Sequence, residues 1–475
     1  MAPGRHDGGV TSQCHAELIA QAWTELGADD VPPVPDRVEI GGSRGHLPSR
    51  YAVEDTAVAC VAAALMAATV LHRERGGVPT QVSVDRAHVA AAVRSERFFR
   101  RRDRPAQAGF APLSRFWRTS DGWVRTHANY PWHRDALVSA LGASDDAGSV
   151  TAAIADLSAT QVEERVFTAG GVAAAVRSLE TWRTHPQGHA VAREPLIGHR
   201  VVGRAAPRIR AAGELPASGV RVLDLTRVIA GPVCSRYLGA LGADVLRLDP
   251  PHRPDMAAGA VADTLLAKRS ALLDLAIPGG RNRLHELLDG ADAVVCGYRP
   301  GALERFGLGE DDLAERHPGL VVVYLSAWGH SGPWVQRRGF DSVVQAPTGI
   351  ALGESLNGDE PGALPCQLLD HGTGYLAAAA VLDSLCRQHH HGGTHIRRLS
   401  LARTAWWLTA TGTVTEPAHR PRRPEEGPKP WLDNLDSAEG TMTAVMPPGR
   451  FDHQRLRWPL APTGYGSHPP AWRSA

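Results

Sequence analysis

Cysteine is scarce in this chain, and the few cysteines are scattered. Six occur among 475 residues, and no two of them form a Cys-x-x-Cys motif. Structural zinc sites and disulfide frameworks need cysteines that are paired or dense. The sequence therefore predicts neither feature, and a reducing, cytoplasmic location is expected. The six are Cys14, Cys60, Cys234, Cys296, Cys366 and Cys386.

The chain also lacks an excess of charge. Lysine and arginine number 51, aspartate and glutamate 50, and the formal net charge is +1. A nucleic-acid-binding surface needs a basic patch or stripe, and no basic stripe with interleaved aromatic residues is present. We expect no nucleic-acid partner.

Long hydrophobic runs are missing as well. The first residues, Met1–Asp7, lack the apolar core of a signal peptide. The longest uncharged apolar run, Ala57–Leu71, is too short and too rich in alanine for a membrane span. The sequence therefore predicts no association with a membrane.

What the chain does contain is a regular alternation of strands and helices after Gly219. Val220–Leu225 and Ala243–Leu248 read as strands, and Pro232–Leu241 between them reads as a helix. Such a strand–helix–strand unit implies a parallel sheet. Because the alternation continues through Leu320–Ser326, residues 219–410 are predicted to form a doubly wound, Rossmann-like α/β domain.

The remaining segments are assigned from their composition and sequence patterns. Residues 113–200 read as a small α+β domain, with a hairpin turned at Ser120-Asp121-Gly122, since Asp-Gly is a strong turn signal. Residues 201–218 are irregular and basic, as a linker would be. Residues 411–475 are rich in proline, glycine and arginine, and are expected to be an extended tail or partly disordered.

One acidic residue lies at or just before the start of an alanine-rich helix. Asp370 precedes the run Gly374–Leu385, which is interrupted only by Asp383 and Ser384 and reads as a buried helix. The free N–H groups and the dipole at a helix start favour an ionised carboxylate. Asp370 can therefore be a nucleophile, or simply an N-cap. Gly372 and Gly374 can likewise be oxyanion donors or serve close helix packing.

The same order of parts occurs near the N-terminus. Asp55 leads an alanine-rich helix, a Gly76-Gly77 turn and a short strand, as Asp370 does with the Gly392-Gly393 turn. Residues 1–112 are therefore predicted to be a partial, degenerate second copy. Asp55 is a second candidate nucleophile, but only Asp370 has a preceding sheet whose carboxyl-end loops can complete a site.

The stretches that surround Asp370 resemble the family III CoA-transferases. This is the CaiB/BaiF group of carnitine-CoA and formyl-CoA transferases, which also includes the α-methylacyl-CoA racemases. The likeness covers residues 219–405. Residues 116–200 look like the family's small domain, which normally follows the large one, so the order here is rearranged. The resemblance is carried by Val222–Pro232, Leu238–Asp249, Lys268–Leu275, Ala291–Gly307, Tyr324–Pro333, Arg338–Gly349 and the stretch at Asp370.

The resemblance implies a CoA-transferase whose substrates are an acyl-CoA and a carboxylic acid. Asp370 would attack the thioester to give an aspartyl anhydride and then an aspartyl-CoA thioester. Coenzyme A is thus expected as part of the substrate, without a metal. Family members form interlocked homodimers, so association is expected here. The positions that match the family's CoA contacts are Val228, Ile229, Ala230, Gly231, Arg247, Lys268, Arg269, Tyr298, Arg299 and Arg305.

Two rival functions remain open at this stage. A racemase or isomerase of the same fold is disfavoured because racemases carry histidine where this chain has Phe340. A non-catalytic CoA-binding protein is the other alternative, since the rearranged order of the domains can have abolished catalysis. The run His389–His391 with His395 lies on a glycine-rich turn without a supporting carboxylate or cysteine, so we expect no metal site there.

Overall fold

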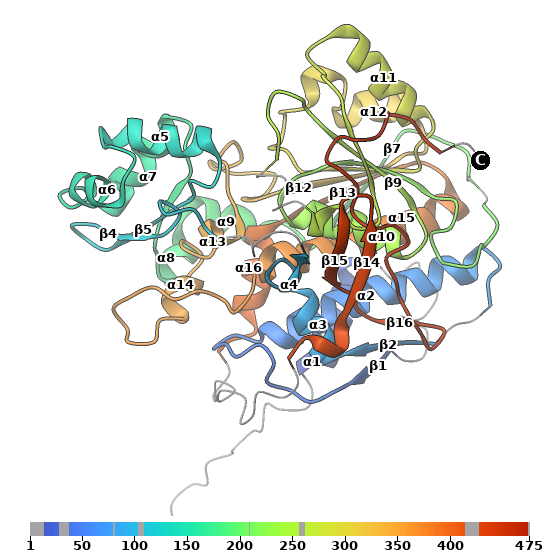
Figure 1. The fold of residues 1–475 in the computed structure, drawn as a ribbon, viewed down its shortest axis with the longest axis horizontal. Helices are drawn as coiled ribbons and strands as arrows, with labels where there is room; N and C mark the ends of the chain where they lie inside the picture. Colours follow the sequence, from blue (N-terminus) through green and yellow to red (C-terminus); the bar gives the residue numbers. More distant parts are fainter. Residues whose placement is uncertain are drawn as a thin grey trace, which may run out of the picture.

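The computed structural model describes most of the chain. Described are residues 14–27, 38–78, 81–102, 109–208, 210–255, 262–413 and 427–473. Figure 1 shows a large body built around one central sheet and a smaller unit at its side.

The central sheet has seven strands in the order β10-β9-β8-β11-β12-β13-β7. The first six run parallel, and β7 pairs antiparallel with β13 at the edge. This confirms an α/β architecture with a large, mainly parallel sheet. Successive strands are added on one side of β8 up to β10 and on its other side from β11 onward. At this switch point between β8 and β11 the connecting loops diverge and leave a crevice. The strands are β7 (Gly198–Val202), β8 (Arg221–Leu225), β9 (Asp244–Asp249), β10 (Arg269–Leu272), β11 (Ala293–Cys296), β12 (Val321–Ser326) and β13 (Thr394–Ser400).

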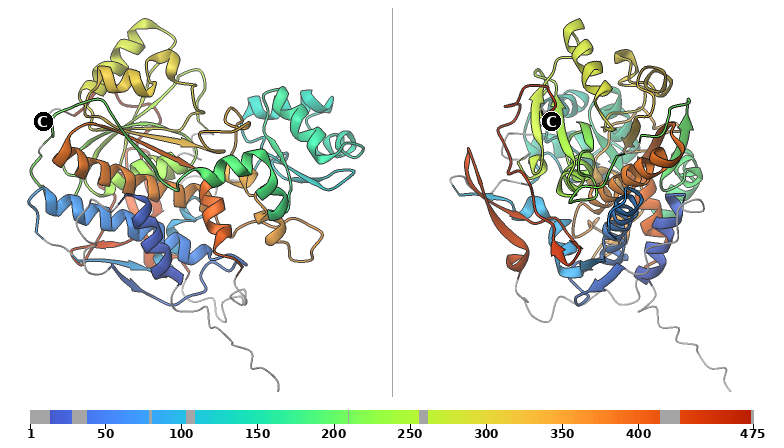
Figure 2. Two further views of the ribbon diagram at one scale, coloured as in Figure 1. Left: turned by 180° about the vertical axis from the view of Figure 1, so that it is seen from behind. Right: turned by 90° about the vertical axis from the view of Figure 1, so that its right-hand side faces the viewer.

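Helices cover both faces of this sheet (Figure 2). Alternate strand residues divide between two hydrophobic clusters, so that Val222 faces one layer and Leu223 the other. The strands are hydrophobic on both sides, as buried parallel strands must be. One layer holds α10 (Ala230–Ala240) and α15 (Leu368–His391); the other holds α11 (Pro278–Asp289) and α12 (Glu310–Arg316).

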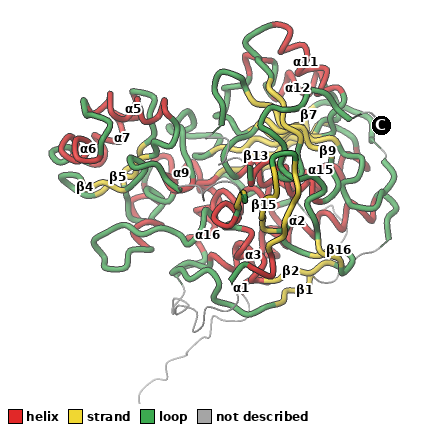
Figure 3. Tube along the Cα trace, viewed as in Figure 1, coloured by secondary structure: helices red, strands yellow, loops and turns green. Residues whose placement is uncertain are grey.

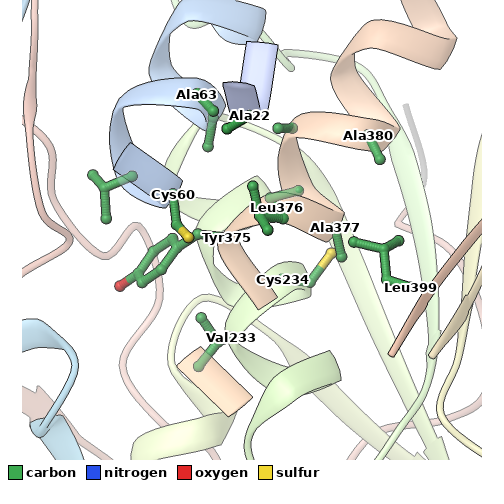
Figure 4. Close-up of a cluster of buried hydrophobic side chains, with 14 of the residues drawn as sticks. Ala22, Cys60, Ala63, Val233, Cys234, Tyr375, Leu376, Ala377, Ala380 and Leu399 are labelled. Atoms are coloured by element: carbon green, nitrogen blue, oxygen red, sulfur yellow. The ribbon is translucent and has the colours of Figure 1, made fainter. Parts of the chain in front are cut away.

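The N-terminal segment adds a further layer on α15. Its long helix α2 (Val53–Glu74) packs against α15, and Figure 4 shows Cys60 of α2 beside Tyr375 of α15. Small side chains allow the two helices to approach closely. Within the described residues, α2 alone is long and apolar enough to cross a membrane, and its apolar stretch is buried in the protein. Also in this segment are α1 (Cys14–Glu25), β1 (Val38–Gly41), β2 (Val82–Asp85), α3 (Arg86–Ala92), α4 (Ser95–Phe98) and β3 (Arg100–Arg101).

The smaller unit has its own core and three-stranded sheet. The hairpin predicted at Ser120–Gly122 is confirmed, since β4 and β5 pair antiparallel around it. Buried Val124, Leu137 and Val162 form part of its core. The next strand, β7, crosses the predicted boundary at residue 200 and joins the main sheet. The elements are β4 (Phe116–Arg118), β5 (Trp123–Thr126), α5 (Pro131–Leu141), α6 (Ala147–Ile154), α7 (Ala159–Thr168), β6 (Ala173–Ala175), α8 (Leu179–Thr184) and α9 (Pro186–Arg193).

The C-terminal segment lies across the N-terminal one. Strand β15 pairs with β3, and β16 pairs with β2, so the segment expected to be extended forms strands on another part of the chain. Figure 3 shows these strands beside the helices of the N-terminal segment. Residues 414–426, which also belong to the predicted tail, lie outside the described residues. The last elements are α13 (Asp341–Val344), α14 (Ile350–Gly353), α16 (Leu401–Ala410), β14 (Leu432–Ser437), β15 (Gly440–Val445), β16 (Arg450–Phe451) and β17 (Gln454–Arg455).

Candidate active site

A cavity of about 680 Å³ opens at the carboxyl ends of β8, β9, β11 and β12. Its walls are the loops that follow these strands, together with the Tyr130–His133 stretch of the smaller unit. Asp370 lies on its wall. Pockets of several hundred Å³ at the switch point of an open parallel sheet are the usual binding sites of such folds.

Asp370 is the third residue of α15, whose first residue is Leu368. The helix therefore begins six residues before the predicted Gly374. The Asp370 side chain is buried, and no described residue forms an ion pair or a hydrogen bond with its carboxylate. Burial, and then the charges of Asp341 and Glu96, raise the pKa of Asp370 well above its usual value.

Asp341 is hydrogen-bonded to the backbone of Asp370. Its Oδ2 atom accepts the Asp370 N–H at 3.0 Å, and its Oδ1 atom accepts the Gln345 side-chain N–H at 2.5 Å. Burial raises the pKa of Asp341 to about 7, although these hydrogen bonds act in the opposite direction. Two buried carboxyl groups this close do not ionise independently, so they titrate as a pair.

The N-terminal segment supplies a third carboxylate. Glu96 of α4 reaches α15, where its Oε2 atom lies 3.2 Å from Nε2 of buried His371. Burial raises the pKa of Glu96, but the hydrogen bond and the charge of His371, together with a backbone hydrogen bond and the charge of Arg97, outweigh burial and leave that pKa below its usual value. Glu96 thus keeps its negative charge beside Asp370. Sequence reasoning missed this residue because α4 and α15 are far apart in the chain.

Asp55 has the opposite environment, although it is also the third residue of its helix. Its Oδ1 atom accepts from Arg86 at 2.7 Å, and its Oδ2 atom accepts from Arg44 at 3.2 Å. Two guanidinium groups therefore neutralise this carboxylate, and Asp55 does not line the cavity. An ion-paired carboxylate is a poorer nucleophile than one without a cation.

The loop after β8 is shaped by close packing. Val228 has φ of 68°, a strained conformation for a β-branched residue, and lies on the cavity wall. A Cβ atom on Gly231 would lie 2.3 Å from the Thr226 side chain, so only glycine fits there. Helix α10 begins at Ala230, and the first N–H groups of a helix have no intrahelical partner. Ala230 and Gly231 line the cavity, whereas Ile229 does not.

Part of the chain matches a known protein family. Residues 217–434 match a family model described as CoA-transferase family III. This segment, just under half of the chain, is similar to that family. It contains the loop at Val228, Asp341 and Asp370.

Relatives of the family III segment carry transferase names. A probable fatty acyl-CoA transferase of Mycobacterium tuberculosis, Rv3272, is 32% identical over 228 residues, which is 45% of this chain and 57% of that protein. The succinyl-CoA–L-malate CoA-transferase beta subunit of Chloroflexus aurantiacus is 35% identical over 190 residues, 38% of this chain and 47% of that protein. The crystal structure of Rv3272 is 34% identical with a TM-score of 0.39, over 42% of this chain and 56% of that one. The chain therefore spans about half the length of the curated relatives it matches.

The predicted CoA contacts of the family III segment divide into two groups. Tyr298, Arg299 and Arg305 follow β11 and line the cavity. Arg299 donates to the Gln336 carbonyl at 2.8 Å, and the guanidinium of Arg305 lies 4.6 Å from the ring centre of Phe306. No carboxylate of the described residues pairs with either arginine. Both charges are thus available to an anion.

The second group is engaged inside the protein. Arg247 binds Asp249 at 2.7 Å and Asp255 at 2.6 Å. Lys268 binds Asp224 at 2.8 Å, and burial lowers its pKa to about 8. These two side chains are fully buried, and the cavity wall contains neither of them.

Arg269 also lies off the cavity wall. It binds Asp244 at 3.0 Å and donates to the Ala471 carbonyl at 2.5 Å. The structure therefore places Arg247, Lys268 and Arg269 as supports of strands and loops around the cavity rather than as parts of its wall.

Gly374 serves helix packing. A Cβ atom there would lie 2.5 Å from the carbonyl oxygen of Ala230, so the glycine lets α15 approach α10. Because α15 begins at Leu368, Gly372 and Gly374 lie inside the helix, where N–H groups bond to carbonyls four residues earlier. We therefore do not assign either glycine as an oxyanion donor.

The histidines near the C-terminus of α15 lie side by side, with ring centres 5.1 Å apart for His389 and His390 and 6.0 Å apart for His390 and His391. His390 lies 3.0 Å from Oε2 of Glu74, while His395 lies 3.0 Å from His199. No group of three or more His, Cys, Asp or Glu side chains in the described ranges is placed to hold a metal ion.

Proposed function

We propose that this chain is a CoA-transferase that moves CoA from an acyl-CoA thioester to a carboxylic acid, with Asp370 as the covalent carrier. The observation that carries the proposal is a buried carboxyl group on the wall of a large cavity, with two carboxyl neighbours and, among the described residues, no cation paired with it. The match to CoA-transferase family III and the transferase names of its relatives support it.

The charge cluster favours the first covalent step. The ionised Asp370 attacks the thioester carbonyl carbon, the C–S bond breaks, and CoA leaves as a thiolate. Asp370 then has a neutral mixed anhydride in place of its charge. Acylation thus relieves the repulsion between Asp370, Asp341 and Glu96, so part of the cost of ionising Asp370 is recovered in this step.

The later steps return every group without net proton transfer. The thiolate attacks the aspartyl carbonyl of the anhydride, which releases the first carboxylate and leaves a thioester on Asp370. The acceptor carboxylate attacks that thioester and again frees the thiolate. The thiolate then attacks the acceptor acyl carbon of the second anhydride, so the new acyl-CoA leaves and Asp370 regains its charge. The exchange is close to thermoneutral, so a covalent carrier matters more than strong acid or base catalysis.

The cavity wall offers partners for the substrate. The free N–H groups of Ala230 and Gly231 at the start of α10 can stabilise a tetrahedral oxyanion or a phosphate. Arg299 and Arg305 provide charge for the CoA phosphates, and Tyr298 can lie along the adenine or the pantetheine arm. We propose that a doubly wound, Rossmann-like sheet presents these groups, as in other folds of this topology.

The function is tested by exchange between an acyl-CoA and an isotopically labelled acid. A panel of CoA esters and acids, read out by product mass, should show label entering the acyl-CoA fraction. Asp370→Asn should abolish the exchange, while Asp55→Asn, at the same position of the paired helix, should retain it. Binding of CoA esters without exchange would establish the non-catalytic alternative. Loss of an α-proton to solvent without exchange would establish the racemase or isomerase.

A further inference from the structure

Two arginines that pair with no carboxylate of the described residues form one corner of the cavity together with a histidine. Arg253 follows β9, Arg338 follows β12, and His133 belongs to α5 of the smaller unit; all three line the cavity. Arg338 donates to the Gly170 carbonyl at 3.0 Å, and the Arg253 guanidinium lies 5.9 Å from the ring centre of Trp132. No carboxylate in the described part of the chain pairs with either guanidinium. We call these three residues the cationic corner.

The members of the cationic corner act on one another. Burial lowers the pKa of Arg338, and the charges of Arg299 and Arg253 lower it further. Burial, and then Arg338 and Arg253, lower the pKa of His133 to about 4. Unneutralised cations that share a partly buried wall are unfavourable unless an anion joins them. The corner therefore has the electrostatics of an empty anion site.

His133 provides a second, independent sign of a missing ligand. The residue is 4% exposed, and within the described ranges its Nδ1 atom has no hydrogen-bond partner. Buried polar atoms without partners are rare and call for an explanation. A neutral imidazole on the cavity wall can donate one hydrogen bond to a bound oxyanion.

The corner is connected to the nucleophile but does not neutralise it. The His133 ring lies 5.8 Å from the ring of Phe340, and the next residue, Asp341, accepts the Asp370 N–H. Burial, Asp341 and Glu96 raise the pKa of Asp370. Asp370, Arg253 and Arg338 line the same cavity, so a substrate that reacts at Asp370 can extend to the two arginines with its other end.

We infer that the cationic corner binds the second carboxylate of a dicarboxylic acid, whose first carboxylate exchanges CoA at Asp370. The inference rests on the proposed transferase function and specifies its substrate class. The CoA phosphates are the other source of an oxyanion, but they lie at the far end of the pantetheine arm from the thioester. Arg299 and Arg305 are available for them on the loop after β11.

The test compares succinate with butyrate as acceptors for acetyl-CoA, using the full chain. The two acids have the same length and differ in one carboxylate. We expect kcat/KM to favour succinate, and this preference to fall roughly 10- to 100-fold in Arg338→Met and Arg253→Met, as for a lost charge-assisted hydrogen bond. Arg338→Lys should restore part of the preference. Arg118→Met is the matched control, because Arg118 also lies over a tryptophan, 5.4 Å from the ring centre of Trp123, but outside the cavity.

Two results would overturn the inference. One is a wild-type chain that uses both acids equally well. The other is an equal loss for both acids in Arg338→Met together with a higher KM for acetyl-CoA, which would assign the corner to the CoA phosphates. If neither acid exchanges, titration calorimetry tests the binding of the two acids independently of the transferase function. Tighter binding of succinate than of butyrate, lost in Arg338→Met, supports the inference. Equal binding of the two acids refutes it.

Discussion

Replacing Asp341 by asparagine tests the charge cluster around Asp370. Because burial and neighbouring carboxylates raise the pKa of Asp370, this group loses its proton only at a pH well above the usual range for aspartate. The nucleophile is the ionised form, so wild-type kcat/KM should rise with pH through that raised pKa. Asparagine keeps the size of Asp341 and an oxygen for the Asp370 N–H, but removes one negative charge.

The expected effect is a shift of the rising limb to lower pH. A unit charge close to a carboxyl group typically moves the pKa of that group by about 1 to 3 units. Each unit corresponds to about 1.4 kcal/mol of interaction between the charge and the ionised carboxylate. Asp341→Asn should therefore reach half of its maximal kcat/KM about 1 to 3 pH units lower than the wild type.

The assay is kcat/KM for acyl exchange, measured from about pH 5 to pH 9, where the limb of the free enzyme reports its essential groups. Asp135→Asn is the control, because Asp135 is an exposed carboxylate on α5 away from the cavity. A limb that stays in place in Asp341→Asn, or moves to higher pH, would refute the reasoning that Asp341 raises the pKa of Asp370.

Three further predictions concern the same elements. Asp370→Asn should raise the midpoint of thermal unfolding near pH 8 and should have no such effect near pH 4. The pKa of Asp370 is raised in the folded protein, so the wild type is stabilised by the bound proton at low pH and loses this stability as the pH rises. Gly374→Ala places a methyl group 2.5 Å from a main-chain carbonyl of α10 and should cost about 1–3 kcal/mol in urea unfolding, whereas Gly372→Ala, whose nearest neighbour is 3.4 Å away, should cost less. Arg305→Met should raise KM for the acyl-CoA with little change in thermal stability. Arg269→Met, which loses internal partners, should lower the thermal stability with little change in KM.

The central sheet was predictable because its strands are buried on both faces. Such strands read as short, continuous apolar runs, and the strand predicted at Val220–Leu225 is β8, Arg221–Leu225. Helix α15 was harder to delimit. Its first turns carry polar and glycine residues, so the alanine-rich run marks only its middle, and the start at Leu368 depends on contacts with Asp341.

The C-terminal strands could not be predicted for a different reason. Strands β15 and β16 are stabilised by pairing with β3 and β2, which lie more than three hundred residues earlier in the chain. Strand preference depends on such partners more than on local sequence. Composition alone therefore suggested an extended tail.

The candidate site was predictable only in part. Asp370 and the loop at Val228 follow from short motifs, and both lie on the cavity wall. Buried ion pairs cannot be told from ligand contacts by residue type, so Arg247 and Lys268 were grouped with the arginines that do line the cavity. Glu96 and His133 reach the site through tertiary packing. The run of aromatic residues and histidines from His127 to His133 was the one local signal for the latter.

The most direct measurement of the central claim is the identity of the residue that becomes acylated during turnover. The chain is incubated with an acyl-CoA, the intermediate is trapped with hydroxylamine or borohydride, and the peptides are analysed by mass spectrometry. The account predicts that the modification lies on Asp370 and is absent in Asp370→Asn. Modification of another carboxylate, or undiminished exchange by Asp370→Asn, would contradict it.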